Sequence, residues 1–165
     1  MTFFLSLVIV SAFSQEKTEK KKKEEGKQEN RRQIEMMINA RDFIFEPRTA
    51  IPTGMRSVSL TGNRNYIKFQ ENLIDSYMPF FGQAYSGVAY SNDTGLSFKE
   101  KPEKFTVTKN RKTFEISAVV KGESDVFRIF LIVGFDGNAS LSISCNNRSP
   151  ISYQGEILVG NNSDK

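Results

Sequence analysis

Five aromatic side chains lie close together between positions 77 and 90, in a stretch that also contains two glycines and a proline. They are Tyr77, Phe80, Phe81, Tyr85 and Tyr90. Glycine and proline predict a loop or the end of a strand here. Aromatic side chains on a loop can line a ligand mouth or contact a partner, and the alternative is that large rings fill the open end of a barrel. We take Tyr77, Phe80, Phe81 and Tyr85 as candidate binding residues and keep both interpretations.

Two arginines and a further tyrosine complete the set of candidate ligand or partner residues. Arg148 carries a planar guanidinium that can hold an anion, although such a side chain more often pairs with a carboxylate or covers a turn. Arg128 stands in the middle of an apolar run. If it points inward, its charge needs a partner, such as Glu115, Asp75 or a ligand, to offset the cost of burial. Tyr153 belongs to the last predicted strand.

The residues that are missing exclude several kinds of catalysis. The chain has no His and one Cys, so it has no Ser-His-Asp triad, no Cys-His dyad, no Cys-based zinc site and no internal disulfide. The glycines are single, which argues against a phosphate-binding loop. We predict no catalytic residues, no metal and no cofactor. A hydrolase that uses two carboxylates stays open, because sequence does not show which carboxylates converge.

The positive charge is concentrated in one segment near the N-terminus. The formal net charge is +4, and residues 16–32 hold six Lys, two Arg and five Glu. The rest of the chain is therefore nearly neutral, and we predict no nucleic-acid partner because no basic stripe interleaves with aromatic residues. Mixed-sign runs are typical of solvated helices or spacers. The cluster Lys20, Lys21, Lys22 and Lys23 could still give weak contact with an anionic membrane surface.

The first fifteen residues have the features of a signal peptide. An apolar run over residues 3–10 is too short to span a bilayer, and small residues precede a cleavage point before Gln15. We therefore predict a signal peptide over residues 1–14, a charged linker or solvated helix over 15–32, one β domain over 33–158 and a frayed tail over 159–165. The single Cys145 is far from this segment, so the mature protein is expected to be periplasmic or secreted and not lipid-anchored. Cys145 shares the apolar face of its strand, which predicts a buried thiol.

The elements that position these residues follow from hydrophobic periodicity. Residues 28–41 have helical spacing, with Ile34, Met37 and Ile38 on one face. From residue 42 onward the period changes to two, which predicts strands. Beyond the first strand, which starts near Phe43, the predicted strands are 56–60, 65–69, 73–78, 96–99, 104–108, 113–121, 125–135, 139–145 and 151–158.

Short strands separated by turn residues predict a mainly β fold. We expect an antiparallel β-barrel or β-sandwich of about nine or ten short strands with one N-terminal helix, because no second helical pattern separates the strands. Asp136-Gly137 predicts a type I′ hairpin turn. The strand at 125–135 is apolar on both faces except at Arg128, which predicts that both faces are covered, one of them by the helix near Ile34.

Three motifs resemble a known bacterial family. They are Asp42-Phe43-Ile44-Phe45 followed by Pro52-Thr53-Gly54 and Arg56-Ser57-Val58-Ser59-Leu60-Thr61; Tyr77-Met78-Pro79-Phe80-Phe81-Gly82-Gln83-Ala84-Tyr85; and Asn147-Arg148-Ser149-Pro150-Ile151-Ser152-Tyr153-Gln154-Gly155-Glu156-Ile157. In this order they are similar to the domain of unknown function 4251 family. The resemblance implies an exported, mostly β domain from a Gram-negative bacterium and implies no activity.

The sequence therefore favours an exported envelope domain that acts as a non-enzymatic binding or interaction module. Its partner would be an unknown protein or a small apolar ligand. The alternatives are a lipocalin-like carrier of a small apolar ligand, which needs an apolar cavity, and the carboxylate-based hydrolase.

Overall fold

The computed structural model describes residues 9–85, 95–123 and 125–160, with side chains from residue 21 onward. Within these ranges the chain forms one helix, α1 (Ile9–Ala40), and ten strands. The strands are β1 (Phe43–Pro52), β2 (Val58–Ser59), β3 (Tyr66–Gln70), β4 (Leu73–Pro79), β5 (Gly95–Glu100), β6 (Pro102–Lys109), β7 (Thr113–Lys121), β8 (Val126–Gly134), β9 (Asn138–Ser144) and β10 (Ile151–Val159). Each strand falls where the period-two pattern predicts one.

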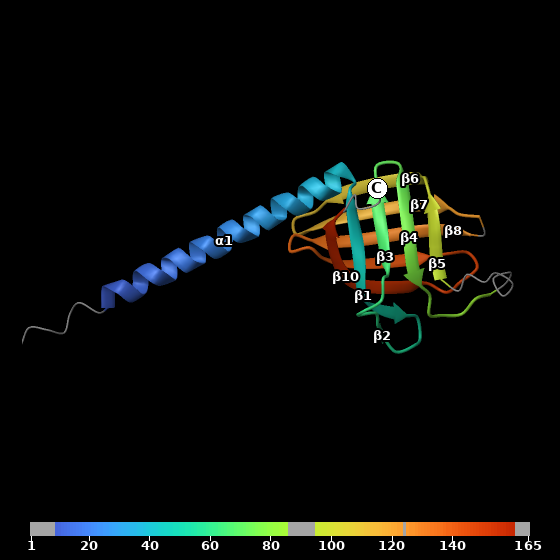
Figure 1. Cartoon of the computed structure of the whole chain (residues 1–165), viewed down its shortest axis with the longest axis horizontal. Helices are drawn as coiled ribbons and strands as arrows, with labels where there is room; N and C mark the ends of the chain where they lie inside the picture. The colour runs from blue at the N-terminus through green and yellow to red at the C-terminus, as the bar shows by residue number, and fades with distance from the viewer. Residues whose placement is uncertain (1–8, 86–94, 124, 161–165) are drawn as a thin grey trace, which may run out of the picture.

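All the strands belong to one antiparallel sheet that curls into a nearly closed barrel. Their order is β5-β4-β3-β1-β10-β9-β8-β7-β6, and the short β2 pairs with β1. Figure 1 shows β1, β3, β4 and β5 as a front layer, with the strands from β7 onward crossing behind it. The two edge strands, β5 and β6, are consecutive in the chain and are separated by Lys101. The predicted β fold with an N-terminal helix is confirmed, and the continuous sheet makes it a barrel.

Aromatic rings join each of the two edge strands to the opposite layer of the barrel. Phe98 of β5 stacks on Phe127 of β8 with ring centroids 4.4 Å apart. Phe105 of β6 meets Phe69 of β3 edge-on, with centroids 6.3 Å apart. Such pairs add to the stabilisation that burial of their apolar area already provides. Side-chain packing therefore joins the layers where the hydrogen-bonded ladder is interrupted.

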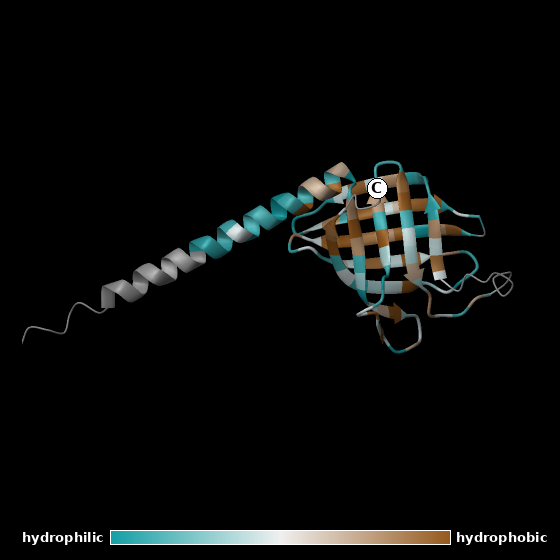
Figure 2. Cartoon of the chain, viewed as in Figure 1, coloured by the Kyte–Doolittle hydropathy of each residue, from teal (hydrophilic) through white to brown (hydrophobic). Residues whose placement is uncertain are grey.

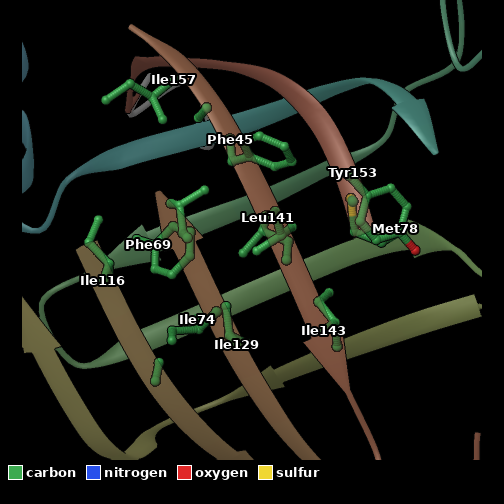
Figure 3. Packing of buried hydrophobic residues seen from close by; sticks show 14 of the residues in the cluster. Phe45, Phe69, Ile74, Met78, Ile116, Ile129, Leu141, Ile143, Tyr153 and Ile157 are labelled. Atoms are coloured by element: carbon green, nitrogen blue, oxygen red, sulfur yellow. The ribbon is translucent and has the colours of Figure 1, made fainter. Parts of the chain in front are cut away.

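The core lies inside the barrel and follows the alternation of the sequence. Along β7, Phe114, Ile116, Ala118 and Val120 are all at most 1% exposed. Figure 3 shows such side chains from front and back strands meeting in the interior. Phe45 comes from the front strand β1, and Leu141 and Ile143 come from the back strand β9. Large side chains from both layers thus occupy the inside of the barrel.

Strand β8 buries only one of its faces. Its inward residues include Ile129 and Leu131, which are at most 1% exposed, whereas Arg128 and Phe130 face solvent. The prediction that the helix covers the second face is wrong. The helix packs at one end of the barrel instead, where Ile34 and Ile38 are 3% and 0% exposed.

Helix α1 extends further toward the N-terminus than the apolar pattern indicated. Its residues 21–33 are exposed, and Figures 1 and 2 show this hydrophilic stretch projecting away from the barrel. The Lys- and Glu-rich run continues the helix because both residues have high helix propensity and make favourable pairs along the surface. No helix among the described residues is both long and apolar enough to cross a membrane.

Contacts on its last turns hold α1 to the barrel end. The Arg31 guanidinium lies 4.0 Å from the centroid of the Phe135 ring, and Lys109 pairs with Glu35. The helix ends at Ala40, and Arg41 adopts a left-handed conformation with φ of 51°. The residues that the 28–41 spacing predicted to face the core are those that pack there.

The turn between β8 and β9 differs from the predicted type. Gly137 has φ of 89°, but Asp136 is not among the described residues with positive φ. A type I′ turn needs positive φ at both central positions, so that prediction is wrong. The Gly137 N–H instead donates to the Gly134 carbonyl across 3.0 Å.

Candidate functional site

The aromatic segment begins on the outer face of β4. Tyr77 is 57% exposed, whereas its neighbours Ser76 and Met78 point inward and are buried. The Tyr77 ring lies beside Tyr66 of β3, with centroids 6.3 Å apart. These two residues are directly paired across the strands. Strand alternation therefore presents a tyrosine pair to solvent at the end of the front layer.

Residues 80–85 form a loop that is pinned to the segment preceding β10. Ala84 and Arg148 form an antiparallel bridge. The Tyr85 N–H donates to the Asn147 carbonyl and the Ser149 N–H donates to the Gln83 carbonyl, each across 2.9 Å. The loop is thus held by main-chain hydrogen bonds to residues more than sixty positions away in sequence.

Gly82 allows this close approach. A Cβ atom at this position would lie 2.5 Å from the Ser149 Oγ and 2.7 Å from the Phe80 Cζ. The Ser149 Oγ in turn accepts a hydrogen bond from the Gln83 N–H at 3.1 Å. A larger side chain at position 82 would push the two loops apart.

The aromatic segment divides into partly buried rings and exposed rings. Phe80 and Phe81 are partly buried and pack against the core, as the barrel-filling interpretation requires. Tyr77 and Tyr85 are 57% and 63% exposed, as a contact surface requires. Tyr90 lies outside the described residues.

Arg148 is buried and covers the loop. It is 7% exposed, and its guanidinium lies 5.3 Å from the centroid of the Phe80 ring. It also donates a hydrogen bond to the Gly95 carbonyl at the start of β5. Arg148 therefore joins the pinned loop to the next strand, which is the turn-covering role considered for it from the sequence.

Tyr153 is an interior anchor of the same end of the barrel. Its side chain is 0% exposed, and its hydroxyl donates to the Pro79 carbonyl across 2.6 Å. Figure 3 shows it beside Met78. Burial raises the pKa of Tyr153 well above its ordinary value, and the neighbouring Cys145 adds to the effect. Tyr153 thus fixes the point at which β4 leaves the sheet.

Asp125 is a member of this cluster that the sequence did not single out. It is 9% exposed, and its Oδ1 accepts hydrogen bonds from the Val126 and Asn146 N–H groups at 2.8 and 2.9 Å. Its Oδ2 accepts from the Asn147 N–H at 3.1 Å. The carboxylate fixes the turn before Arg148. An aspartate before a strand is too common a signal to have revealed these contacts with residues twenty-one and twenty-two positions away.

Cys145 and Arg128 flank this turn. Burial raises the pKa of Cys145 from 9.0 to about 11, and the charge of Asp125 adds to it, while Arg148 and Arg128 oppose it. A thiol with such a pKa stays protonated at neutral pH and is a poor nucleophile. Arg128 points outward, and its Nη1 donates to the Asn146 Oδ1 at 3.1 Å.

The structure therefore brings together most of the predicted residues at the end of the barrel opposite the helix. Phe80, Phe81, Arg148 and Tyr153 build a rigid base, and Tyr77 and Tyr85 are its exposed tyrosines. Among the described residues, no group of three or more His, Cys, Asp or Glu could hold a metal ion. Both oxygens of the buried Asp125 are engaged by main-chain donors.

Comparisons with known proteins agree on a family that has no assigned activity. The family model described as "Domain of unknown function (DUF4251)" matches residues 25–157. The crystal structure of a DUF4251 family protein from Bacteroides eggerthii DSM 20697 is similar, with a TM-score of 0.60 and 16% sequence identity. The similarity covers 79% of this chain and 87% of that chain, and at this identity it concerns the fold alone. No curated protein matches the chain.

Proposed function

Because this chain belongs to the DUF4251 family, for which no activity is assigned, we propose that it is an exported, non-enzymatic binding module that contacts a protein partner. The match confirms the family resemblance of the three sequence motifs. The contact surface is formed by Tyr77 and Tyr85, which we call the tyrosine surface.

The observation that carries this proposal is an exposed tyrosine on an immobilised loop. Tyr85 is 63% exposed, yet its own N–H is bonded to the Asn147 carbonyl. Tyrosine is enriched at protein interfaces because it buries a large apolar area and retains a polar hydroxyl. A loop that is already ordered loses little further conformational entropy on binding. This combination favours a protein partner over a small apolar ligand, since side chains occupy the barrel interior.

A site-specific photocross-linking experiment in the host cell tests the contact. The photoreactive residue p-benzoylphenylalanine is placed at position 77, 85 or 130 of the full chain. Phe130 is the matched control, because it is an exposed aromatic residue on β8, at 42% exposure. We expect a discrete cross-linked product from positions 77 and 85 and none from position 130. Equal products from all three positions, or none at 77 and 85, would contradict the proposal.

Export is supported by the signal-peptide features of residues 1–14, although residues 1–8 lie outside the described part of the chain. The test is the intact mass of the protein recovered from a periplasmic or culture fraction. We expect a mature chain that begins at Gln15. A cytoplasmic protein that retains residue 1 would refute this part of the proposal.

A further inference from the structure

A hollow of about 430 Å³ lies on the outside of the front layer. It adjoins Tyr77 of the tyrosine surface, because the ring of its lining residue Tyr66 lies 6.3 Å from the Tyr77 ring. Residues 63–65, in the loop between β2 and β3, form one wall. The outward side chains of β1, β3 and β4 form its floor. Its volume falls within the range of about 300–1,000 Å³ that is usual for small-molecule sites.

The strand register places the floor residues in two adjacent rows. Lys68 of β3 pairs with Ile44 of β1 on one side and with Asp75 of β4 on the other. Tyr66 lies two residues before Lys68, so both side chains leave the same face of β3, whereas Ile67 between them is buried. An aromatic ring therefore stands next to charged groups along one side of the hollow.

The charges that line the hollow cancel. Arg64 and Lys68 contribute two positive charges, and Glu46 and Asp75 contribute two negative charges. Asp75 also forms an ion pair with Lys99, whose Nζ lies 3.4 Å from the Asp75 Oδ2. A ligand with several charges of one sign would be attracted by one pair and repelled by the other. An apolar ligand would strip water from four charged groups without replacing it.

A neutral ligand rich in hydroxyl groups avoids both penalties. It carries no charge to be repelled, and its hydroxyl groups can replace the water that the charged side chains lose. The side-chain amides of Asn63 and Asn65 both donate and accept hydrogen bonds, as each sugar hydroxyl does. Carboxylate oxygens and a guanidinium fork can each bind two neighbouring hydroxyls at once. The Tyr66 ring offers an apolar face to the carbon-bound hydrogens of a sugar ring.

We propose that the hollow formed by residues 63–65, Tyr66, Lys68, Glu46 and Asp75 binds a neutral saccharide. This site goes beyond the proposed protein contact and lies on different residues. The two can therefore fail separately.

The binding test is a titration of the ¹⁵N-labelled full chain with maltose, lactose, cellobiose and chitobiose, followed by amide chemical shifts. We expect at least one disaccharide to give saturable shifts concentrated at residues 63–68 and at Asp75. If none of the four moves these amides at up to about 50 mM, a range that detects even millimolar affinity, the proposal is wrong. Shifts concentrated elsewhere on the barrel would equally overturn it.

Variants separate saccharide recognition from a loss of folding. We expect Tyr66→Ala to weaken binding roughly tenfold, since an aromatic contact of this kind is worth about that factor. Tyr66→Phe, which retains the ring, should bind nearly as tightly as the wild type. Unchanged affinity in a folded Tyr66→Ala protein would contradict the assigned site.

A second hollow provides a matched control. It also measures about 430 Å³ and lies on the outer face of the back layer, lined by residues such as Ser140 and Gln154 and by no aromatic side chain. Gln154→Ala should therefore leave the affinity unchanged. Glucose 6-phosphate should bind no more tightly than glucose. Tighter binding of the phosphate would identify an anion site and refute the neutral-saccharide proposal.

Discussion

Replacing Tyr153 with phenylalanine removes one buried oxygen atom and tests how the loop end of the barrel is held. The hydroxyl donates to the Pro79 carbonyl across 2.6 Å, and the side chain is 0% exposed. Tyr153→Phe leaves that carbonyl without its donor in the interior. Such a loss costs about 1–3 kcal/mol in the free energy of unfolding. For a domain of this size it lowers the Tm by roughly 2–10 °C.

The destabilisation caused by Tyr153→Phe should become smaller at alkaline pH. The folded state raises the pKa of Tyr153 above its ordinary value of 10.0, so the unfolded chain releases this proton first. The contribution of the protonated Tyr153 hydroxyl to the free energy of unfolding of the wild type is therefore complete below pH 10 and is lost as the pH rises further. Phenylalanine has no proton to lose. The difference in stability between the wild type and Tyr153→Phe should therefore narrow above pH 10.

Urea unfolding followed by circular dichroism between pH 7 and pH 11 measures both effects. Cys145 also makes the free energy of unfolding fall as the pH rises, because folding raises its pKa from 9.0 to about 11. Both proteins are therefore compared in a Cys145→Ala background. Tyr85→Phe is the matched control, since its ring is 63% exposed and its change should stay within about 0.5 kcal/mol. A neutral-pH cost as small as that of the control, or a gap that stays constant above pH 10, would refute the reasoning.

Three further perturbations test other parts of the structure. Gly155→Ala should lower the free energy of unfolding by about 3 kcal/mol or more, because its Cβ would lie 2.0 Å from the Glu46 carbonyl oxygen in the adjacent strand β1. Urea unfolding measures this change. The control is Gly26→Ala, which has open space around it and should leave the unfolding of the barrel unchanged. Asp125→Asn should cost about 1–3 kcal/mol, since an amide cannot replace all three accepted hydrogen bonds, and exchange of the Asn146 and Asn147 amide protons should quicken; unchanged exchange would argue against the carboxylate as the organiser of that turn. A variant with glutamine at positions 20–23 in place of the four lysines should no longer sediment with vesicles that contain anionic lipid. Each basic residue near such a surface contributes about 1 kcal/mol to the binding free energy. Equal sedimentation of the variant and the wild type would contradict the membrane contact expected from the sequence.

The sequence was most informative where one face of an element is apolar. The alternation along 113–121 predicted the buried face of β7, and the spacing of Ile34 and Ile38 predicted the helix face that packs on the barrel. These predictions hold because side-chain direction repeats every two residues in a strand and every 3.6 in a helix. The same reasoning failed for β8, since an apolar residue such as Phe130 gives no sign of what covers it, and here it faces solvent.

The sequence predicted only part of the candidate site. Residue types and turn propensity identified the aromatic segment, but they left open which rings fill the barrel and which face outward. Only the tertiary structure separates Phe80 and Phe81 from Tyr85. It does so because main-chain bonds to Asn147 and Ser149 set the path of the loop, and such long-range pairing leaves no periodic trace in the sequence.

The sequence by itself therefore determined the family, the order of the elements and the nearly neutral β domain beyond a charged helix. The absence of His and the presence of one Cys also follow from the sequence alone. The tertiary structure decided that the sheet closes into a barrel, that Arg128 points outward and that Tyr153 points inward. It also placed Arg64, Tyr66 and Asp75 around one hollow. The physical reason is that local periodicity sets which residues share a face, whereas the curl of the sheet and the docking of distant loops set what each face meets.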